Sequence, residues 1–160
     1  MAKTGSVTWD EGAGPAPNAR RILPGLVAAY FGQGRQTLAR NPQPAEFHAL
    51  RLATKRLRYI LELFRPCYGP AFRARLAALH RLQQLLGEVN DCAAAAAVLR
   101  EAAGRKSAQL PRLEEFLRRR GFAKTEEFRR EWTQAFDAPG QERWWTTYLA
   151  RQARTPGRKP

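Results

Sequence analysis

Apolar side chains recur along most of the chain at intervals of three and four residues, the spacing of an amphipathic helix. No segment alternates between apolar and polar residues with the period of two that a strand shows. Proline and glycine clusters divide the pattern into segments. The predicted helices run over residues 22–40, 45–65, 70–86, 92–103, 110–120, 124–136 and 141–151. The sequence therefore predicts an all-α fold, an antiparallel helical bundle of about six or seven helices.

Turn-forming residues set the predicted boundaries. Gly87 is expected to end the third helix, and Asn90 and Asp91 are candidates to cap the start of the fourth. Gly121 is expected to separate the fifth helix from the sixth. Composition gives the domain organisation: a flexible N-terminal lead-in over residues 1–20, a single helical domain over 21–151 and a basic flexible tail over 152–160.

Composition adds a strong positive charge to this picture. Lysine and arginine number 28 among 160 residues, against 14 aspartate and glutamate, which gives a formal net charge of +14. The field of such a protein concentrates anions around it. A persistently anionic partner is therefore expected, and composition alone leaves open nucleic acid, inorganic polyphosphate, an anionic membrane and an acidic protein.

Membrane insertion and metal binding receive no support from the sequence. No run of about 18 apolar residues occurs, so no membrane span is predicted. Residues 1–20 lack the apolar core of a signal peptide, and we expect a cytoplasmic protein. Cys67 and Cys92 are too far apart in sequence for a zinc knuckle, so we expect no metal or other cofactor. Two reduced thiols are the expected state, with a disulfide as the alternative.

The segment from Phe47 to Phe64 concentrates the charge on one helix face. At 100° per residue, four basic side chains fall within an arc of about 80°. We call these residues the basic stripe: His48, Arg51, Lys55 and Arg58. Apolar residues cover the opposite side, at Leu50, Ala53, Leu57, Ile60, Leu61 and Phe64. Arg56 lies off the stripe, and Glu62 lies at its far end.

Like charges at this spacing repel one another by a few tenths of a kcal/mol per pair. No acidic residue interrupts the stripe between His48 and Arg58. A bound polyanion would relieve the repulsion, and so would carboxylates from another helix, for which Glu88 and Asp91 are candidates. A solvated face is the third interpretation. The pattern favours a ligand-binding stripe and leaves the other two open.

The next predicted helix carries further basic residues. Arg73, Arg75, His80 and Arg81 lie in it. Arg73 and Arg75 fall off its predicted core seam and could extend the basic surface. The seam consists of Phe72, Leu76, Leu79, Gln83 and Leu86.

Two motifs in this region resemble a known family. The run H-x-x-R-x-x-x-K-R-L-R-Y-x-L-E-L-F covers His48 to Phe64, and L-x-x-L-H-R-L-Q-Q-L-L-G-E-V-N-D covers Leu76 to Asp91. Together they are similar to the CHAD family, the conserved histidine α-helical domain, over about residues 22–149. The resemblance implies an all-helical fold and binding of inorganic polyphosphate through a basic surface, often in association with polyphosphate granules.

The resemblance also implies particular binding residues. The family's basic motif matches at His48, Arg51, Lys55, Arg56 and Arg58, and its aromatic position matches at Tyr59. Arg75 and Arg81 occupy places where the family often has basic residues. Gly87 and Asp91 match the turn that closes the second motif. Asp91 is interpreted as a cap and a possible partner of a motif arginine.

One departure from the family bears on oligomeric state. A full family domain contains two related helical halves, each with a version of the stripe, whereas this chain has one copy that looks like the second half. The expected arrangement is a homodimer in which each chain supplies one of the two stripes.

Three rival functions differ in the residues they need. Nucleic-acid binding requires groove-reading side chains or exposed stacking aromatics, and the candidates Trp132, Phe136, Trp144 and Trp145 are better explained as core. A scaffold for an acidic protein needs only the charge. A polyphosphate enzyme needs a metal-binding carboxylate cluster or a glycine loop that holds phosphate; the acidic residues are scattered, so no enzyme is predicted.

Overall fold

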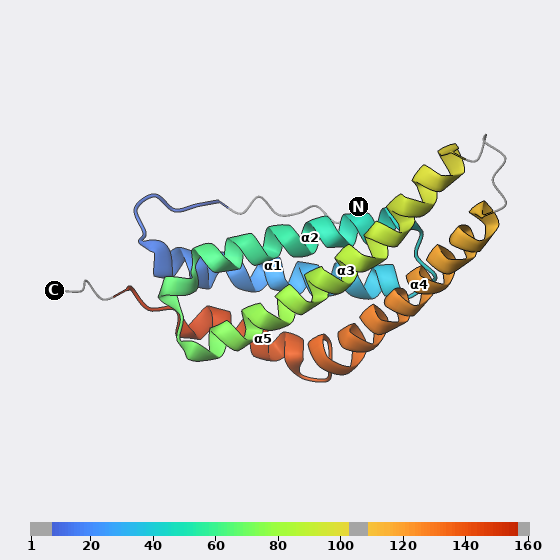
Figure 1. The fold of residues 1–160 in the computed structure, drawn as a ribbon. Coiled ribbons are helices and arrows are strands. Elements are labelled where there is room, and N and C mark those ends of the chain that lie inside the picture. Colours follow the sequence, from blue (N-terminus) through green and yellow to red (C-terminus); the bar gives the residue numbers. More distant parts are fainter. Residues whose placement is uncertain (1–7, 103–108, 157–160) are drawn as a thin grey trace.

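The computed structural model describes residues 8–102 and 109–156 (Figure 1). All regular structure in these two ranges is helical, without a strand. The elements in chain order are α1 (Pro15–Leu38), α2 (Pro44–Leu63), the short 3-10 helix η1 (Arg65–Cys67), α3 (Pro70–Ala102), α4 (Leu110–Glu131), the π-helical turn η2 (Trp132–Phe136) and α5 (Gln141–Gln152). The predicted all-α fold is confirmed, although the described residues form five α-helices and not six or seven.

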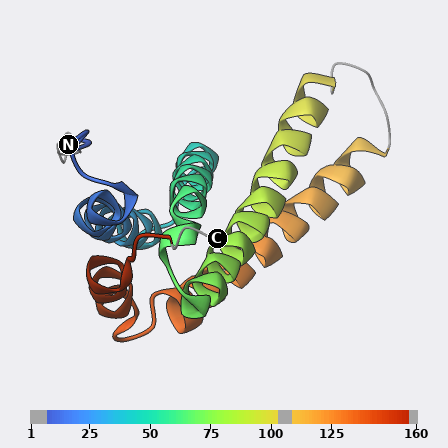
Figure 2. The same ribbon diagram turned by 90° about the vertical axis from the view of Figure 1, so that its left-hand side faces the viewer.

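The helices pack as a series of neighbours. The N-terminal helix α1 lies between α5 and α2, α2 packs on α3, and α3 packs on α4. At 1.5 Å per residue, the 33 residues of α3 span about 50 Å, against about 30 Å for the 20 residues of α2. The α3–α4 pair therefore continues past the end of α2 as a hairpin that leans away from the other three helices (Figure 2).

Two glycines that were expected to end helices lie inside them. Gly87 is within α3 and Gly121 is within α4, so the predicted breaks at these positions are wrong. The predicted caps Asn90 and Asp91 are also helix-interior residues. A glycine in a helix costs about 1 kcal/mol relative to alanine, which packing offsets here. A Cβ atom on Gly121 would lie 3.5 Å from Cβ of Cys92, so this glycine marks the close contact of α3 and α4.

The chain is ordered over more of its N-terminal part than expected. The first helix begins at Pro15, not at residue 22, and Ala16, Asn18 and Ala19 are buried. The Asn18 side-chain amide donates hydrogen bonds to the carbonyls of Asp10, Ala13 and Gly14, at 2.9, 2.9 and 3.2 Å. The expected flexible lead-in over 1–20 is therefore wrong for residues 15–20, and residues 1–7 lie outside the described part of the chain.

The C-terminal segment is likewise attached to the bundle just after α5. Ala153 is fully buried, and its carbonyl accepts a hydrogen bond from Nε of Arg20 at 2.9 Å. The Arg154 amide donates to the carbonyl of Cys67 at 2.8 Å. These contacts contradict a tail that is flexible from residue 152; residues 157–160 lie outside the described ranges.

An aromatic cluster fills the core where α1, η2 and α5 meet. Trp132 and Trp145 are among its largest fully buried side chains, and Phe31 stacks on Phe136 with 4.7 Å between ring centroids. Of the four aromatic residues predicted as core, 132, 136 and 145 are buried, which confirms the prediction, whereas Trp144 is only partly buried against the core. A Cβ atom on Gly34 would overlap the Trp132 indole, so the absence of a side chain there lets the ring lie against α1.

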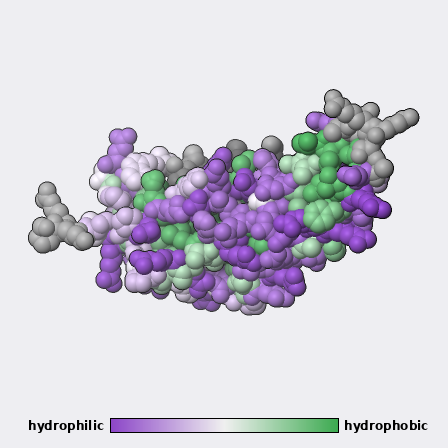
Figure 3. All heavy atoms as spheres, viewed as in Figure 1, coloured by the Kyte–Doolittle hydropathy of each residue, from purple (hydrophilic) through white to green (hydrophobic). Residues whose placement is uncertain are grey.

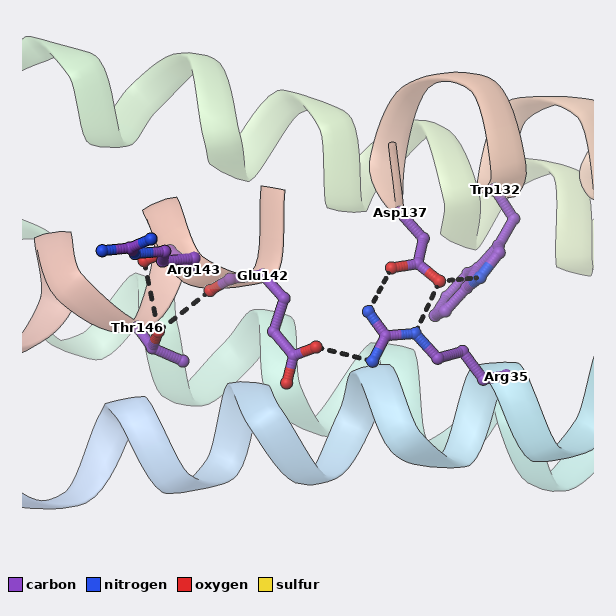
Figure 4. Close-up of polar contacts among 6 residues, drawn as sticks. All are labelled: Arg35, Trp132, Asp137, Glu142, Arg143 and Thr146. Atoms are coloured by element: carbon purple, nitrogen blue, oxygen red, sulfur yellow. Dashed lines mark hydrogen bonds and ion pairs between the residues drawn. The ribbon is translucent and has the colours of Figure 1, made fainter. Parts of the chain in front are cut away.

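A polar network fastens α1 to the α4–α5 connection beside this core (Figure 4). Nε of Arg35 donates to Oδ2 of Asp137 at 2.8 Å, and its Nη1 lies 2.6 Å from Oε2 of Glu142. The same Asp137 oxygen accepts from the Trp132 indole N–H at 3.2 Å. Hydrogen bonds to both carboxylates raise the pKa of Arg35 above its usual range.

Both cysteines are buried and neither forms a disulfide. Cys67 lies in η1, and Cys92 lies in α3. Burial raises the pKa of the Cys67 thiol, which favours its protonated form. The expectation of two unpaired thiols is met in this structure.

Candidate functional site

The basic stripe lies on α2, whose start is fixed by local chemistry. Pro44 occupies the first helical turn, where its missing N–H costs nothing. The Gln43 backbone N–H donates to Oε2 of Glu46 at 2.8 Å, and Arg40 pairs with Oε1 of the same carboxylate at 2.7 Å. These contacts hold the pKa of Glu46 below its usual range, with the backbone hydrogen bond as the larger cause. The buried residues Phe47, Leu50, Thr54, Leu57 and Leu61 lie on the other side of α2, so the basic face is partly exposed and partly against α3.

Three residues of α3 meet the stripe. Nε of Arg58 donates to Oε1 of Gln83 at 2.8 Å, and Nδ1 of His48 lies 3.0 Å from Nδ2 of Asn90. Between these contacts, a Cβ atom on Gly87 would lie 3.9 Å from Nε of Arg51. We call Gln83, Gly87 and Asn90 the polar row. Every member of the row is uncharged, so α3 provides polar contacts to the stripe without neutralising it.

The four stripe residues differ in how far they are already engaged. The Arg58 side chain is only 12% exposed; it also pairs with Glu62, and its Cζ lies 4.4 Å from the centre of the Tyr59 ring. Lys55 is exposed, with Nζ 5.7 Å from the same ring centre. Nε of Arg51 is shielded from solvent and has no hydrogen-bond acceptor among the described residues. Arg58 is therefore largely held by the protein, whereas Arg51 and Lys55 keep unused donors.

The carboxylates that were candidates to neutralise the stripe lie elsewhere. Glu88 forms an ion pair with Lys124 of α4 at 2.5 Å, which raises the pKa of Lys124. Asp91 is exposed, and within the described residues it forms no ion pair with an arginine of the stripe. Among those residues, Glu62 is the carboxylate that reaches the stripe, at Arg58. The internally paired interpretation thus applies to Arg58 and not to the stripe as a whole.

A hollow of about 410 Å³ lies at the end of the stripe, between the C-terminal end of α2 and the first half of α3. We call it the end hollow. Its polar lining residues are Glu62, Arg65, Arg73, His80, Arg81 and Gln84. Arg81, a predicted site residue, contributes to this lining and also pairs with Glu127 of α4 at 2.8 Å.

The remaining two predicted site residues, Arg56 and Arg75, belong neither to the basic stripe nor to the lining of the end hollow. Arg56 is exposed and, by its position in α2, lies off the stripe. Arg75 packs against α5: its Cζ lies 3.8 Å from the centre of the Trp144 ring, and it donates to Gln141. Burial lowers the pKa of Arg75. Its contacts give it a structural role between α3 and α5.

The sequence interpretation missed the polar row and Arg65. Gln83 was assigned to the core seam, Gly87 to a helix end and Asn90 to a cap. Their spacing of four and three residues was the available signal, since it places all three on one face of a continuous helix. Arg65 follows Glu62 by three residues and could have been found as a continuation of the stripe.

Within residues 8–102 and 109–156, no group of three or more histidine, cysteine, aspartate or glutamate side chains is placed to hold a metal ion. In the same ranges no helix has both the length and the apolar character to cross a bilayer. Figure 3 shows mainly hydrophilic side chains on one face, with an apolar patch toward the free end of the α3–α4 hairpin.

The fold and the stripe together define an all-helical basic protein that presents a row of cations along one helix. The family model described as the CHAD domain matches residues 4–100, more than half of the 160-residue chain. The chain belongs to the CHAD family. The match includes α2 and most of α3, whereas α4, η2 and α5 lie beyond it. Comparisons with curated proteins and with solved structures give no match.

Proposed function

We propose that the protein binds inorganic polyphosphate, without catalysis, through the basic stripe. The observation that carries the proposal is the pairing of a cationic row on α2 with an uncharged row on α3. His48 and Arg51 face Asn90 and Gly87, so their charge is available to a ligand. Membership of the CHAD family supports the same ligand.

The stripe suits a linear polymer of phosphates because its cations follow one another along the helix axis. An arginine offers parallel N–H donors that match two phosphate oxygens, and a lysine offers a mobile point charge. Arg51 and Lys55 would supply these two kinds of contact. Counterions released by each contact make binding of a linear polyanion fall steeply with salt. We expect the same behaviour here.

Nucleic acid is the nearest alternative ligand, since it is also a linear polyanion. Tyr59, 49% exposed, is an aromatic side chain next to Lys55 of the stripe that could stack on a base. A competition experiment separates the two ligands: labelled long-chain polyphosphate is bound to the protein, and duplex or single-stranded DNA is added at several salt concentrations. The proposal expects polyphosphate to remain bound at DNA concentrations, counted as phosphate, that equal its own. Displacement by DNA under those conditions would overturn it.

The absence of catalysis is part of the proposal. Incubation of the protein with polyphosphate and added Mg²⁺ or Mn²⁺ should release no phosphate above a protein-free control. Release that is lost in a stripe variant would assign an enzymatic role to the same site. An acidic protein as the partner would instead appear as co-purification that survives digestion of polyphosphate.

We further propose that two chains pair, because one chain has a single stripe. The hairpin carries exposed apolar side chains, including Val98 at 64%, Phe116 at 57% and Phe122 at 68%. Exposed apolar surface of this kind is typical of an interaction site. Light scattering across a concentration series should show a dimer, and replacement of Phe116 and Phe122 by Ser should shift it toward monomer. A wild-type protein that stays monomeric at high concentration would contradict the pairing.

The cellular location follows from the ligand. We propose that the protein is cytoplasmic and collects on polyphosphate granules. A fluorescent fusion should coincide with a polyphosphate stain and become diffuse when polyphosphate synthesis is removed. A fusion that keeps the same pattern without polyphosphate would contradict this location.

A further inference from the structure

We infer that the end hollow is a second anion-binding position, which only a long polyphosphate chain can occupy together with the stripe. This inference rests on the proposed function. It adds a basis for chain-length preference: a short chain contacts the stripe, and a long chain also reaches Arg65, Arg73 and His80 by passing Glu62.

The hollow continues the line of the stripe. Positions 48, 51, 55, 58 and 62 follow one another in steps of three and four, so they trace one face of α2, and Arg65 begins the 3-10 helix η1 just past its end. Glu62 and Arg65 both line the hollow, and Glu62 also pairs with Arg58 of the stripe. Within α2 the rise from His48 to Glu62 is about 21 Å. A linear ligand that follows the stripe therefore reaches the hollow at the end of this helix.

The charge of the hollow is only partly balanced by the protein. Arg65, Arg73 and His80 form no ion pair with a carboxylate of the described residues, and all three are exposed. Arg81 is bound to Glu127 at 2.8 Å, and the carboxylate of Glu62 is directed to Arg58. The hollow thus keeps two unpaired guanidinium groups and one imidazole around a space of about 410 Å³. That space admits phosphate groups together with water.

Glu62 separates the two cationic positions. It is the one acidic residue in the series from 48 to 65 that lies in line with the stripe, and its side chain is 40% exposed. A carboxylate at this point neutralises Arg58 and repels a phosphate chain that crosses it. A short chain avoids the repulsion by staying near Arg51 and Lys55. A long chain is repelled by Glu62 where it crosses this residue, but it also gains contacts with Arg65, Arg73 and His80 in the hollow.

The test compares two double variants that lose the same charge. R65A/R73A removes the two unpaired arginines of the hollow, and R112A/R120A removes two exposed arginines of α4. Calorimetry measures the affinity of each variant for tripolyphosphate and for long-chain polyphosphate at several salt concentrations. We expect R65A/R73A to lose at least about tenfold in long-chain affinity and to reduce the salt slope by about 2, with tripolyphosphate affinity unchanged. The control should change little with either ligand.

Two results would overturn the inference. One is an equal loss of affinity for both ligands in R65A/R73A, which would mean that the two arginines act only through the overall positive potential of the protein. The other is long-chain affinity in R65A/R73A equal to that of the control. Failure of the proposed function looks different, since the wild-type protein would then bind neither ligand. Circular dichroism of each variant checks that the helices are intact.

A second variant tests the role of Glu62 without removing any cation. E62Q keeps the side-chain shape and removes the negative charge. We expect a several-fold gain in long-chain affinity and a smaller gain for tripolyphosphate, because only the long chain crosses this position. No gain, or a gain of the same size for both ligands, would contradict the separating role of Glu62.

Discussion

Arg51 of α2 lies over Gly87 of α3, at a point where a Cβ atom on residue 87 would be 3.9 Å from the arginine Nε. That distance is an ordinary van der Waals contact, so α3 passes close to the Arg51 side chain at this glycine. Gly87, a residue of the second motif, thus lies beside the first motif across the contact of α2 with α3. This relationship connects the two sequence motifs physically and makes Arg51 the central residue of the stripe.

Loss of the two least engaged stripe cations should weaken polyphosphate binding. R51A/K55A removes donors that no carboxylate of the described residues occupies. A hydrogen bond to a charged group contributes about 1.5 kcal/mol or more, so we expect affinity to fall by at least roughly tenfold. Calorimetry at fixed ionic strength measures the change. R112A/R120A, with the same net charge, serves as the control; an equal loss in both variants would mean that net charge alone determines affinity.

Binding should tighten as the pH is lowered from about 8 to about 6, because an imidazole gains a proton in this range. His48 contacts Asn90 through Nδ1 at 3.0 Å, which leaves its other ring nitrogen free of that contact. His80 is the other histidine of the chain and lines the end hollow. Affinity measured at both pH values should show a reduced dependence in H48Q and least in H48Q/H80Q. An unchanged dependence in the double variant would exclude both histidines.

Arg75 should be needed for stability and not for binding. The R75A substitution removes the side chain that packs on Trp144 at 3.8 Å and donates to Gln141. A partly desolvated cation–π contact contributes up to about 2 kcal/mol, so we expect a loss of roughly 1–2 kcal/mol in unfolding free energy. Urea unfolding measures this loss. R73A is the matched variant, with the opposite expectation: stability unchanged and long-chain polyphosphate affinity reduced.

Two glycines of α1 should respond to alanine in opposite directions. In G34A the new Cβ overlaps the Trp132 indole, and such overpacking costs about 1–3 kcal/mol. In G32A the new Cβ meets nothing within 4 Å, so alanine should stabilise the helix by up to about 1 kcal/mol. Thermal melts followed by circular dichroism compare the two. A lower melting temperature in G32A would show that helix propensity is not what limits this segment.

Stability should decline at alkaline pH partly through Tyr30. Burial raises the pKa of Tyr30 well above its ordinary value, although the hydrogen bond to Thr54 at 2.7 Å opposes the shift. The folded state therefore favours the neutral phenol. This contribution is complete below about pH 10, the ordinary pKa of a tyrosine, and is lost as the pH rises above it. Urea unfolding at about pH 8 and about pH 11 should show a smaller decline in Y30F than in the wild type. Part of the decline should remain, because burial also raises the pKa of Tyr68.

The parts of the fold that depend on local spacing could be predicted from sequence. The apolar and basic arcs of α2 follow from residue positions within one helix, so the stripe and its buried counterface agree with the structure. The length of α3 could not be predicted in this way. Gly87 and Asn90 are ordinary stop and start signals, and the residues beside which they lie, Arg51 and His48, belong to another helix.

The same limit explains the site residues. Arg73 and Arg75 are two positions apart, and the local sequence does not show which of them is available to a ligand. Arg75 packs on the ring of Trp144, which is far away in sequence. Arg81 similarly forms an ion pair with Glu127 of α4. A basic residue was assigned to the binding surface by its charge, whereas its availability depends on partners that only the packed helices bring near it.

The contact between the first helix and the last has a consequence for how the chain can be divided. The family match ends at residue 100, but the apolar side of α1 is covered by α5 and η2, through contacts such as the Phe31–Phe136 stack. Arg35 is likewise held by Glu142, and the Ala153 carbonyl by Arg20. The region matched by the family model is therefore shorter than the folding unit, and a fragment cut at the end of the match would leave α1 with an uncovered face.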